Sequence, residues 1–176
     1  MSYKSIKELY RLGNIAAAKA ALVDALKNNA LTVFEKKSVI RLNAEALLEA
    51  YVASMPPEPK KWEIMEIVHT GNVRIIDQLD VAEFPVAAQY ELLKLNDIGI
   101  FKRHFLRYPK VKFCDRVDLF IIRSGDRSFA AAYLAANWLD KEAEEALLDS
   151  NDLDLIRCYF CKYEECCKVA EAIRIE

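Results

Sequence analysis

The sequence has no apolar run long enough to cross a membrane. Its longest uncharged apolar stretch is residues 129–136, whereas a membrane-spanning helix needs about 18 apolar residues or more. The first 13 residues also lack the apolar core of a secretory signal, because Lys4, Lys7, Glu8 and Arg11 interrupt them. We therefore predict a protein without a transmembrane segment and without a cleaved signal peptide.

Neither sign of charge is in large excess. The chain carries 25 Lys and Arg against 27 Asp and Glu, a net charge of −2, which disfavours a general nucleic-acid-binding protein because such proteins are basic. Hydrophobic residues make up 53% of the chain and charged residues 30%, a balance typical of a soluble globular protein. Five cysteines, an odd number without a signal peptide, indicate reduced thiols and a cytoplasmic protein.

Recognisable catalytic motifs are missing. The two histidines, His69 and His104, lie 35 residues apart, and the chain has no Gly-rich phosphate loop, no Gly-x-Ser-x-Gly elbow and no His-Glu-x-x-His motif. We therefore predict that the protein is not an enzyme and carries no cofactor.

Four cysteines cluster near the end of the sequence: Cys158, Cys161, Cys166 and Cys167. Thiolates at this spacing could hold zinc or form a redox pair. However, Cys158 and Cys161 fall where the last repeat buries its apolar stripe, and buried cysteine behaves as a small hydrophobic residue. Packing in the core or cap is the favoured interpretation, and the metal and redox roles are the alternatives.

Sustained alternation of polar and β-branched residues is also missing, so we predict no sheet and an all-α fold. An Asn or Asp, which we call the marker, instead recurs every 25 to 29 residues, at Asn14, Asn43, Asn72, Asp97, Asp126 and Asp152. The preceding residue is Gly or Asn in five of the six copies and Leu42 in the second. Gly and Asn readily end a helix in the left-handed conformation, and Asn and Asp begin the next helix as N-caps. Each marker therefore predicts a tight turn between two antiparallel helices, although in the second copy the helix could continue through Leu42.

The flanks of the markers support this pattern. The residue four before each marker is apolar in all six copies, and apolar pairs recur at three and four residues after it. We predict an α-solenoid of about six stacked helix–turn–helix repeats in one domain over residues 1–176, with units 2–30, 31–59, 60–84, 85–113, 114–140 and 141–176. We also expect residues 164–175 to form an extra capping helix.

Residues 67–79 resemble the part of an ankyrin repeat in which the first helix ends in Gly followed by His, Asn or Asp and the second helix begins. The units are shorter than the usual ~33 residues. The Thr-Pro-Leu-His opening is absent, and no Gly-Ala-Asp stretch follows the second helices, so β-hairpin fingers are not expected. A HEAT-like helical hairpin is the alternative, and either resemblance implies a binding scaffold without chemistry of its own.

Two sets of residues are candidates for binding a partner. Three residues before the markers stand Arg11, Ile40, His69, Lys94, Arg123 and Asp149, at the ends of the first helices. The helix dipole favours cations there and can account for them alone, and the alternative is that they line a binding groove. The fourth unit has a charge of +4, and its second helix carries the basic residues Lys102, Arg103 and Arg107.

These features lead to two hypotheses. The first is a non-catalytic scaffold, adaptor or inhibitor that binds a protein partner, with no membrane association. Self-association is also possible, because the first unit is rich in alanine. The alternative, which we favour less, is a nucleic-acid-associated helical-repeat protein that uses Lys102, Arg103 and Arg107.

Overall fold

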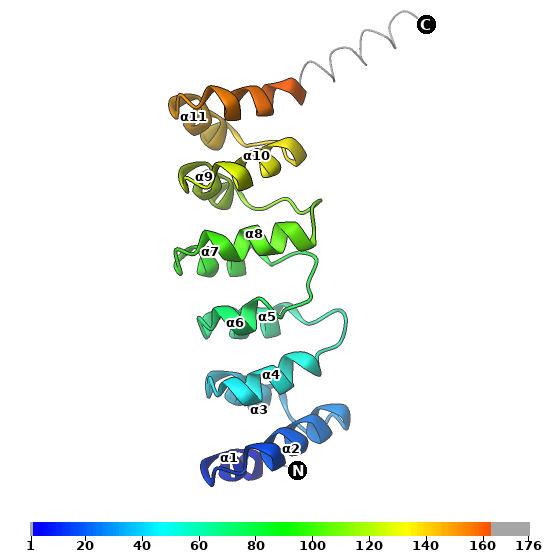
Figure 1. Ribbon diagram of the computed structural model, residues 1–176. Helices are drawn as coiled ribbons and strands as arrows, with labels where there is room; N and C mark the ends of the chain where they lie inside the picture. Colours follow the sequence, from blue (N-terminus) through cyan, green and yellow to red (C-terminus); the bar gives the residue numbers. More distant parts are fainter. Residues whose placement is uncertain (1, 163–176) are drawn as a thin grey trace, which may run out of the picture. The chain divides into compact units, whose positions relative to one another are not determined.

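The computed structural model describes residues 2–162 (Figure 1), and the described part is helical with no strand. This confirms the predicted all-α class. The helices are α1 (Tyr3–Arg11), α2 (Ile15–Lys27), α3 (Val33–Arg41), α4 (Glu45–Ala53), α5 (Lys61–His69), α6 (Val73–Ile76), α7 (Val86–Leu93), α8 (Ile98–Arg107), α9 (Asp115–Arg123), α10 (Arg127–Ala136) and α11 (Lys141–Asp149), and residues 153–162 are also helical. The predicted capping helix at 164–175 lies outside the described residues.

The chain divides into two compact units, Met1–Leu95 and Asn96–Glu176. The boundary falls inside the predicted fourth repeat, between its first helix α7 and its second helix α8. The single repeat domain over residues 1–176 stays a prediction.

The first unit, residues 1–95, consists of two layers of helices. The first helices of the hairpins contact one another in chain order, α1 with α3, α3 with α5, and α5 with α7. The second helices do the same, α2 with α4 and α4 with α6 (Figure 1). The core lies between the layers and contains fully buried side chains from both, such as Ile6, Leu22, Leu47, Ile67 and Ile75. Each hairpin therefore buries its apolar stripe partly against the next one.

The second unit has a core rich in aromatic rings. Helix α9 contacts α10 and α11. Phe113, just before α9, lies 5.4 Å from Phe101 and 5.5 Å from Tyr133, measured between ring centroids. The Tyr133 hydroxyl donates to the buried carboxylate of Asp118 at 2.6 Å and accepts from the Phe113 amide at 3.1 Å. The backbone amide of Leu139 makes the same kind of bond to Tyr159, again 20 residues later. A buried tyrosine thus fixes the start of a hairpin twice in this unit.

Five of the six predicted turns have the expected backbone. Gly13, Gly71, Asn96, Gly125 and Asn151 all have φ between +51° and +78°. The following Asn or Asp accepts a hydrogen bond from an amide in the first turn of the next helix, as in Asn72 with Ile75 and Asp126 with Phe129. The predicted left-handed residue and the Asn or Asp N-cap that follows it are therefore confirmed at these five turns.

The second turn is shifted by one residue. Helix α3 ends at Arg41, and Asn43 itself takes the left-handed conformation with φ +48°. The alternative in which the helix continues through Leu42 is therefore wrong. Ala44 becomes the N-cap of α4 and makes no side-chain cap bond. As a consequence, the residue in this hairpin that is equivalent to Arg11 and His69 is Arg41, not the buried Ile40.

The third hairpin also departs from the expected pattern. Its second helix, α6, covers only Val73–Ile76, whereas the apolar pattern predicts helix as far as Leu79. Leu79 and Val81 are nevertheless buried, because the irregular segment after α6 stays packed against the core.

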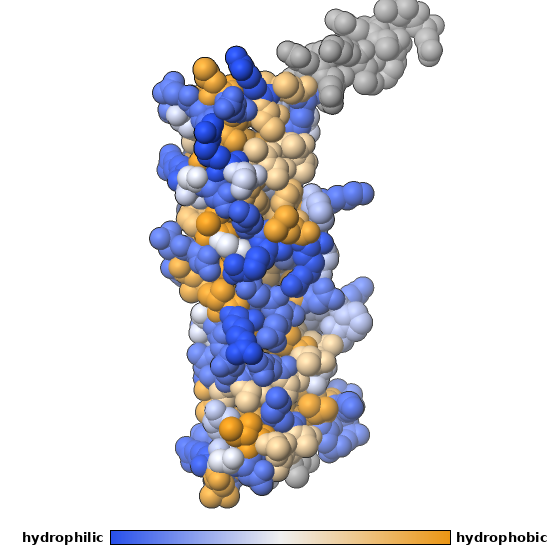
Figure 2. Space-filling view, in the orientation of Figure 1, coloured by the Kyte–Doolittle hydropathy of each residue, from blue (hydrophilic) through white to orange (hydrophobic). Residues whose placement is uncertain are grey.

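No helix among residues 2–162 combines the length and the apolar character that a membrane span requires. On the face shown in Figure 2, hydrophilic side chains cover much of the surface, and hydrophobic side chains form patches between them.

The left-handed turns lead to a first prediction. A Cβ at Gly71 would lie 3.6 Å from the side chain of Leu95, an ordinary contact, so the cost of Gly71→Ala comes from its φ of +66°. We expect Gly71→Ala to lower the free energy of unfolding by about 1 kcal/mol. Gly71→Asn should cost less, because Asn96 and Asn151 adopt the same conformation in equivalent turns. Urea denaturation measures both, and an Asn variant less stable than the Ala variant would contradict this account.

Candidate protein-binding face

The first helices of residues 1–95 share one pattern of exposure. Counted from each N-cap, the second, fifth and ninth residues are exposed or half-buried, whereas the seventh and eighth face the core in α5, as Ile67 and Val68. Because these helices contact one another in chain order, equivalent residues lie in rows across them. The outer face of α1, α3, α5 and α7 is therefore a continuous surface with a repeating register.

The residue nine positions after the N-cap is basic in each of these four helices. We call this row the basic column, and it consists of Arg11, Arg41, His69 and Lys94. The first three are the last residues of α1, α3 and α5, and Lys94 caps α7. All four are exposed. The helix dipole stabilises a cation at each of these helix ends.

Arg41 is held in place by a carboxylate of the next first helix. Its Nε and Nη2 each donate to Glu66 at 2.8 Å, and Lys37 Nζ lies 3.0 Å from the same carboxylate. Lys37 also lies over the ring of Trp62, 5.5 Å from its centroid. Glu66 is only 7% exposed, and the hydrogen bonds from Arg41 lower its pKa the most. One buried anion thus orders two cations on the surface.

Lys94 at the other end of the column pairs within its own helix. Its Nζ lies 2.7 and 2.8 Å from the two oxygens of Glu91. These bonds lower the pKa of the Glu91 carboxyl, and the charge of His69 contributes in the same direction. An exposed pair three residues apart contributes little to stability.

Three aromatic side chains lie on the same face. Phe34 is 76% exposed and Tyr90 39% exposed, and Trp62 is half-buried beneath Lys37. Phe34 extends from the solvent side of α3. Aromatic side chains combined with arginine are the typical anchors of protein interfaces.

In the layer of second helices of the same unit, charged side chains form ion pairs with one another. Arg74 after the third turn lies 2.7 Å from Glu45 and 3.1 Å from Glu49, and Lys19 of α2 lies 4.0 Å from Glu49. These ion pairs join α2 to α4 and α4 to α6. Charge on this layer therefore links neighbouring hairpins.

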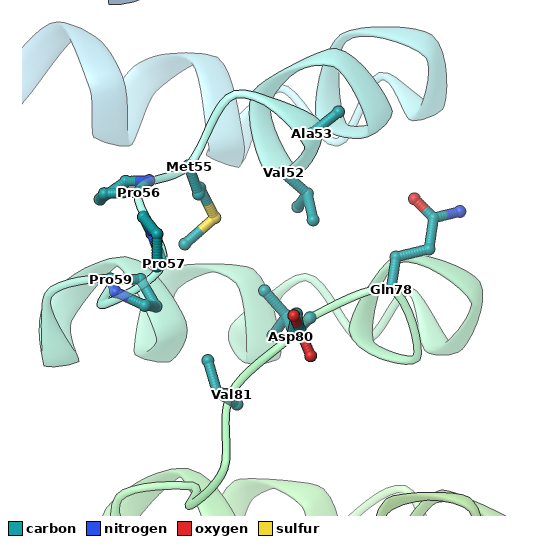
Figure 3. Close-up of a pocket in the computed structure, with 10 residues that line it drawn as sticks. Val52, Ala53, Met55, Pro56, Pro57, Pro59, Gln78, Asp80 and Val81 are labelled. Atoms are coloured by element: carbon teal, nitrogen blue, oxygen red, sulfur yellow. The ribbon is translucent and has the colours of Figure 1, made fainter. Parts of the chain in front are cut away.

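Two hollows lie along the second helices. One, of about 440 Å³, is lined by the proline-rich segment after α4 and the segment after α6. In Figure 3, Val52 and Met55 extend toward the segment that carries Asp80 and Val81. A wider hollow of about 870 Å³ over α2 and α4 shares Ala53 and Gln78 with it. Most of the side chains lining the first hollow are apolar, which offers few groups for recognising a specific ligand.

The basic residues predicted in the fourth repeat belong to the second unit and are largely paired. Lys102 lies 2.6 Å from Asp126, and Arg103 lies 3.8 Å from Asp97. The bond from Lys102 is the main cause that lowers the pKa of Asp126 to about 2. Arg107 and Arg123 are exposed near the ends of α8 and α9. Arg123 extends the predicted row in sequence, but it lies in a different unit from the basic column.

Cys158 and Cys161 form no disulfide in the structure. Cys158 is half-buried and donates to the carbonyl of Ala131 at 3.6 Å, and Cys161 is exposed. Cys166 and Cys167 lie outside the described residues. Within residues 2–162, no three His, Cys, Asp or Glu side chains are grouped so that they could hold a metal ion.

The sequence placed Arg11, His69 and Lys94 in one row. In the structure α1 contacts α3, α3 contacts α5 and α5 contacts α7, so these three residues lie on the same layer of helices. The prediction missed Arg41, Phe34 and Tyr90. The signal that could have found Arg41 is the capping box of Thr32 and Glu35, which fixes where α3 begins. Counting nine residues from that N-cap reaches Arg41.

No protein-family model, curated protein or solved structure matches this chain.

The pairing of Glu66 gives a second prediction. Its pKa is lower in the folded protein than in the unfolded chain, so its charge stabilises the fold above the ordinary pKa and this contribution is lost as the pH falls through the folded pKa. We expect Glu66→Gln to destabilise the protein at pH 7, with the difference from wild type shrinking below about pH 4. Glu91→Gln is the matched control and should have a smaller effect, because its pair is exposed. A difference that stays constant from pH 7 to pH 3 would assign the loss to packing, not to charge.

Proposed function

We propose that this chain is a non-catalytic repeat scaffold, an adaptor or inhibitor, that binds a protein partner through the outer face of α1, α3, α5 and α7. The observation that carries the proposal is the basic column of Arg11, Arg41, His69 and Lys94, which shares that face with the three aromatic residues Phe34, Trp62 and Tyr90. The helix dipole accounts for the cations alone, but it does not account for aromatic side chains left exposed beside them.

The architecture that we propose is an ankyrin-like or HEAT-like α-solenoid of about six antiparallel helical hairpins without β-hairpin fingers. Support comes from the five joints that have the expected left-handed residue and N-cap. Further support is the contact of each first helix with the next within residues 1–95. Scaffolds of this type present a repeated surface on which rows of equivalent residues can be varied independently of the core.

A non-catalytic role agrees with how the ionisable residues of the described part are used. Asp118, the most buried carboxylate, pairs with Lys112 and accepts from Tyr133, which ties the start of one hairpin to its second helix. Glu63 is buried and accepts from Tyr51 at 2.8 Å, which joins α4 to α5. These groups stabilise the fold through bonds between helices.

Nucleic acid is the weaker candidate partner. The residues that suggested it, Lys102 and Arg103, are paired with Asp126 and Asp97 in the second unit. The pair of Lys102 with Asp126 links two hairpins, and the strongest aromatic exposure among the described residues lies elsewhere, at Phe34.

The test is capture of partners with a face variant and a matched control. The face variant is Phe34→Ala with Lys94→Glu, two exposed positions on α3 and at the end of α7. The control is Leu106→Ala with Lys27→Glu, which removes an equally exposed apolar side chain and reverses one lysine away from the face. Each protein serves as bait for chemical crosslinking in a lysate of its source cells, followed by mass spectrometry.

We expect wild type and control to capture the same protein and the face variant to capture at least about tenfold less, since losing a hot-spot anchor typically costs about 2 kcal/mol or more and about 1.4 kcal/mol is tenfold in affinity. Circular dichroism melts check that both variants remain folded. Equal capture by the face variant, or tight binding of single-stranded DNA without any captured protein, would overturn the proposal.

A further inference from the structure

The spacing of the basic column restricts what kind of segment can bind it. Arg11, Arg41, His69 and Lys94 stand at equivalent positions on consecutive packed helices. Packed helices lie about 8–10 Å apart, so the cations repeat at roughly that distance across the face. A ligand that pairs with all of them must present carboxylates at the same interval.

An extended chain meets this requirement with few residues. It rises about 3.1 Å per residue in the polyproline conformation, so every third side chain recurs at about 9 Å and points to the same side. Such a chain reaches the four residues of the basic column with about ten residues. A ligand helix laid across the column rises about 1.5 Å per residue and would need acidic groups seven residues apart, so about 22 residues.

The aromatic residues lie beside the column in two rows: Phe34 and Trp62 are second after their N-caps, and Tyr90 is fifth. Phe34 precedes Arg41 by seven residues in α3, and Tyr90 precedes Lys94 by four in α7. At about 1.5 Å per residue, the aromatics lie about 6–10 Å from the cations along the helix axes. A polyproline-like chain has three faces, and the face next to the acidic one would lie toward these rings.

The cations have hydrogen-bonding capacity for such a ligand. The two bonds from Arg41 to Glu66 use Nε and Nη2, and its guanidinium has five N–H donors in all. Lys94 is engaged by Glu91 in an exposed pair within one helix, which a ligand carboxylate can replace.

Resting on the proposed function, we infer that the partner contributes an extended acidic segment with a carboxylate at every third residue and an apolar residue beside each one. This segment crosses α1, α3, α5 and α7 along the basic column, and its apolar residues lie against Phe34, Trp62 and Tyr90. The face would then select its ligand by the spacing of the ligand's carboxylates as well as by their charge.

The experiment compares fluorescein-labelled peptides by anisotropy with the full chain. The first probe is a 12-residue peptide of four Asp-Leu-Ser repeats, and the second has the same composition with its Asp residues in one block. A third probe is a 12-nucleotide single-stranded DNA. The protein variants are Arg41→Gln and Lys94→Gln, with Lys27→Gln at the exposed end of α2 as the matched control.

We expect the spaced peptide to bind at least tenfold more tightly than the block peptide. Arg41→Gln and Lys94→Gln should each weaken it threefold to tenfold, and Lys27→Gln should leave it unchanged. Lys94→Arg should keep the affinity, because it keeps the charge. Two results would overturn the inference. One is binding that weakens equally with added salt for both peptides, because affinity would then depend on charge and not on spacing. The other is tighter binding of the DNA probe.

The outcome separates this inference from the proposed function. If a protein is captured in a face-dependent manner but the spaced peptide has no advantage, the scaffold stands and the extended acidic segment is wrong. If face-dependent capture also fails, the scaffold itself is wrong.

Discussion

The joint between the two helices of each hairpin is the constraint on which the rest of this structure depends. A residue with positive φ ends the first helix, and the next residue caps the second through its side chain at five of the six turns. Within each unit, a turn this short forces the helices to be antiparallel and fixes the phase of both. Once the phase is fixed, the rows that face the core and the rows that face solvent follow from helical periodicity alone.

The joints could be predicted from the sequence because their chemistry is local. Gly71 and Asn72 need no distant partner to end one helix and begin another. The second joint was misplaced for the same reason, since Asn43 takes the left-handed position itself and Ala44 has no side chain with which to cap. A shift of one residue exchanged the buried Ile40 for the exposed Arg41, and one member of the candidate face was missed.

The candidate face could be predicted only in part, because pairing between distant residues leaves no local mark. Counting charges favoured Lys102 and Arg103, whose partners Asp126 and Asp97 lie 24 residues away and six residues away. The anchoring of Arg41 by Glu66, 25 residues along the chain, was equally invisible. The apolar pattern also could not separate Phe34 from core residues, because an apolar residue at a helical interval is normally buried.

Glu66 links the packing of two hairpins to the proposed binding face. This carboxylate lies in α5 and holds Lys37 and Arg41 of α3, so the bond that joins two hairpins also orders the central cation of the basic column. Ordering a long side chain before a ligand arrives removes part of the entropy loss on binding. Lys94 lacks such an anchor in a neighbouring first helix, because its partner Glu91 lies on its own helix. The middle of the face is therefore better organised than its end, and the proposed partner would gain most where two hairpins already share an ion pair.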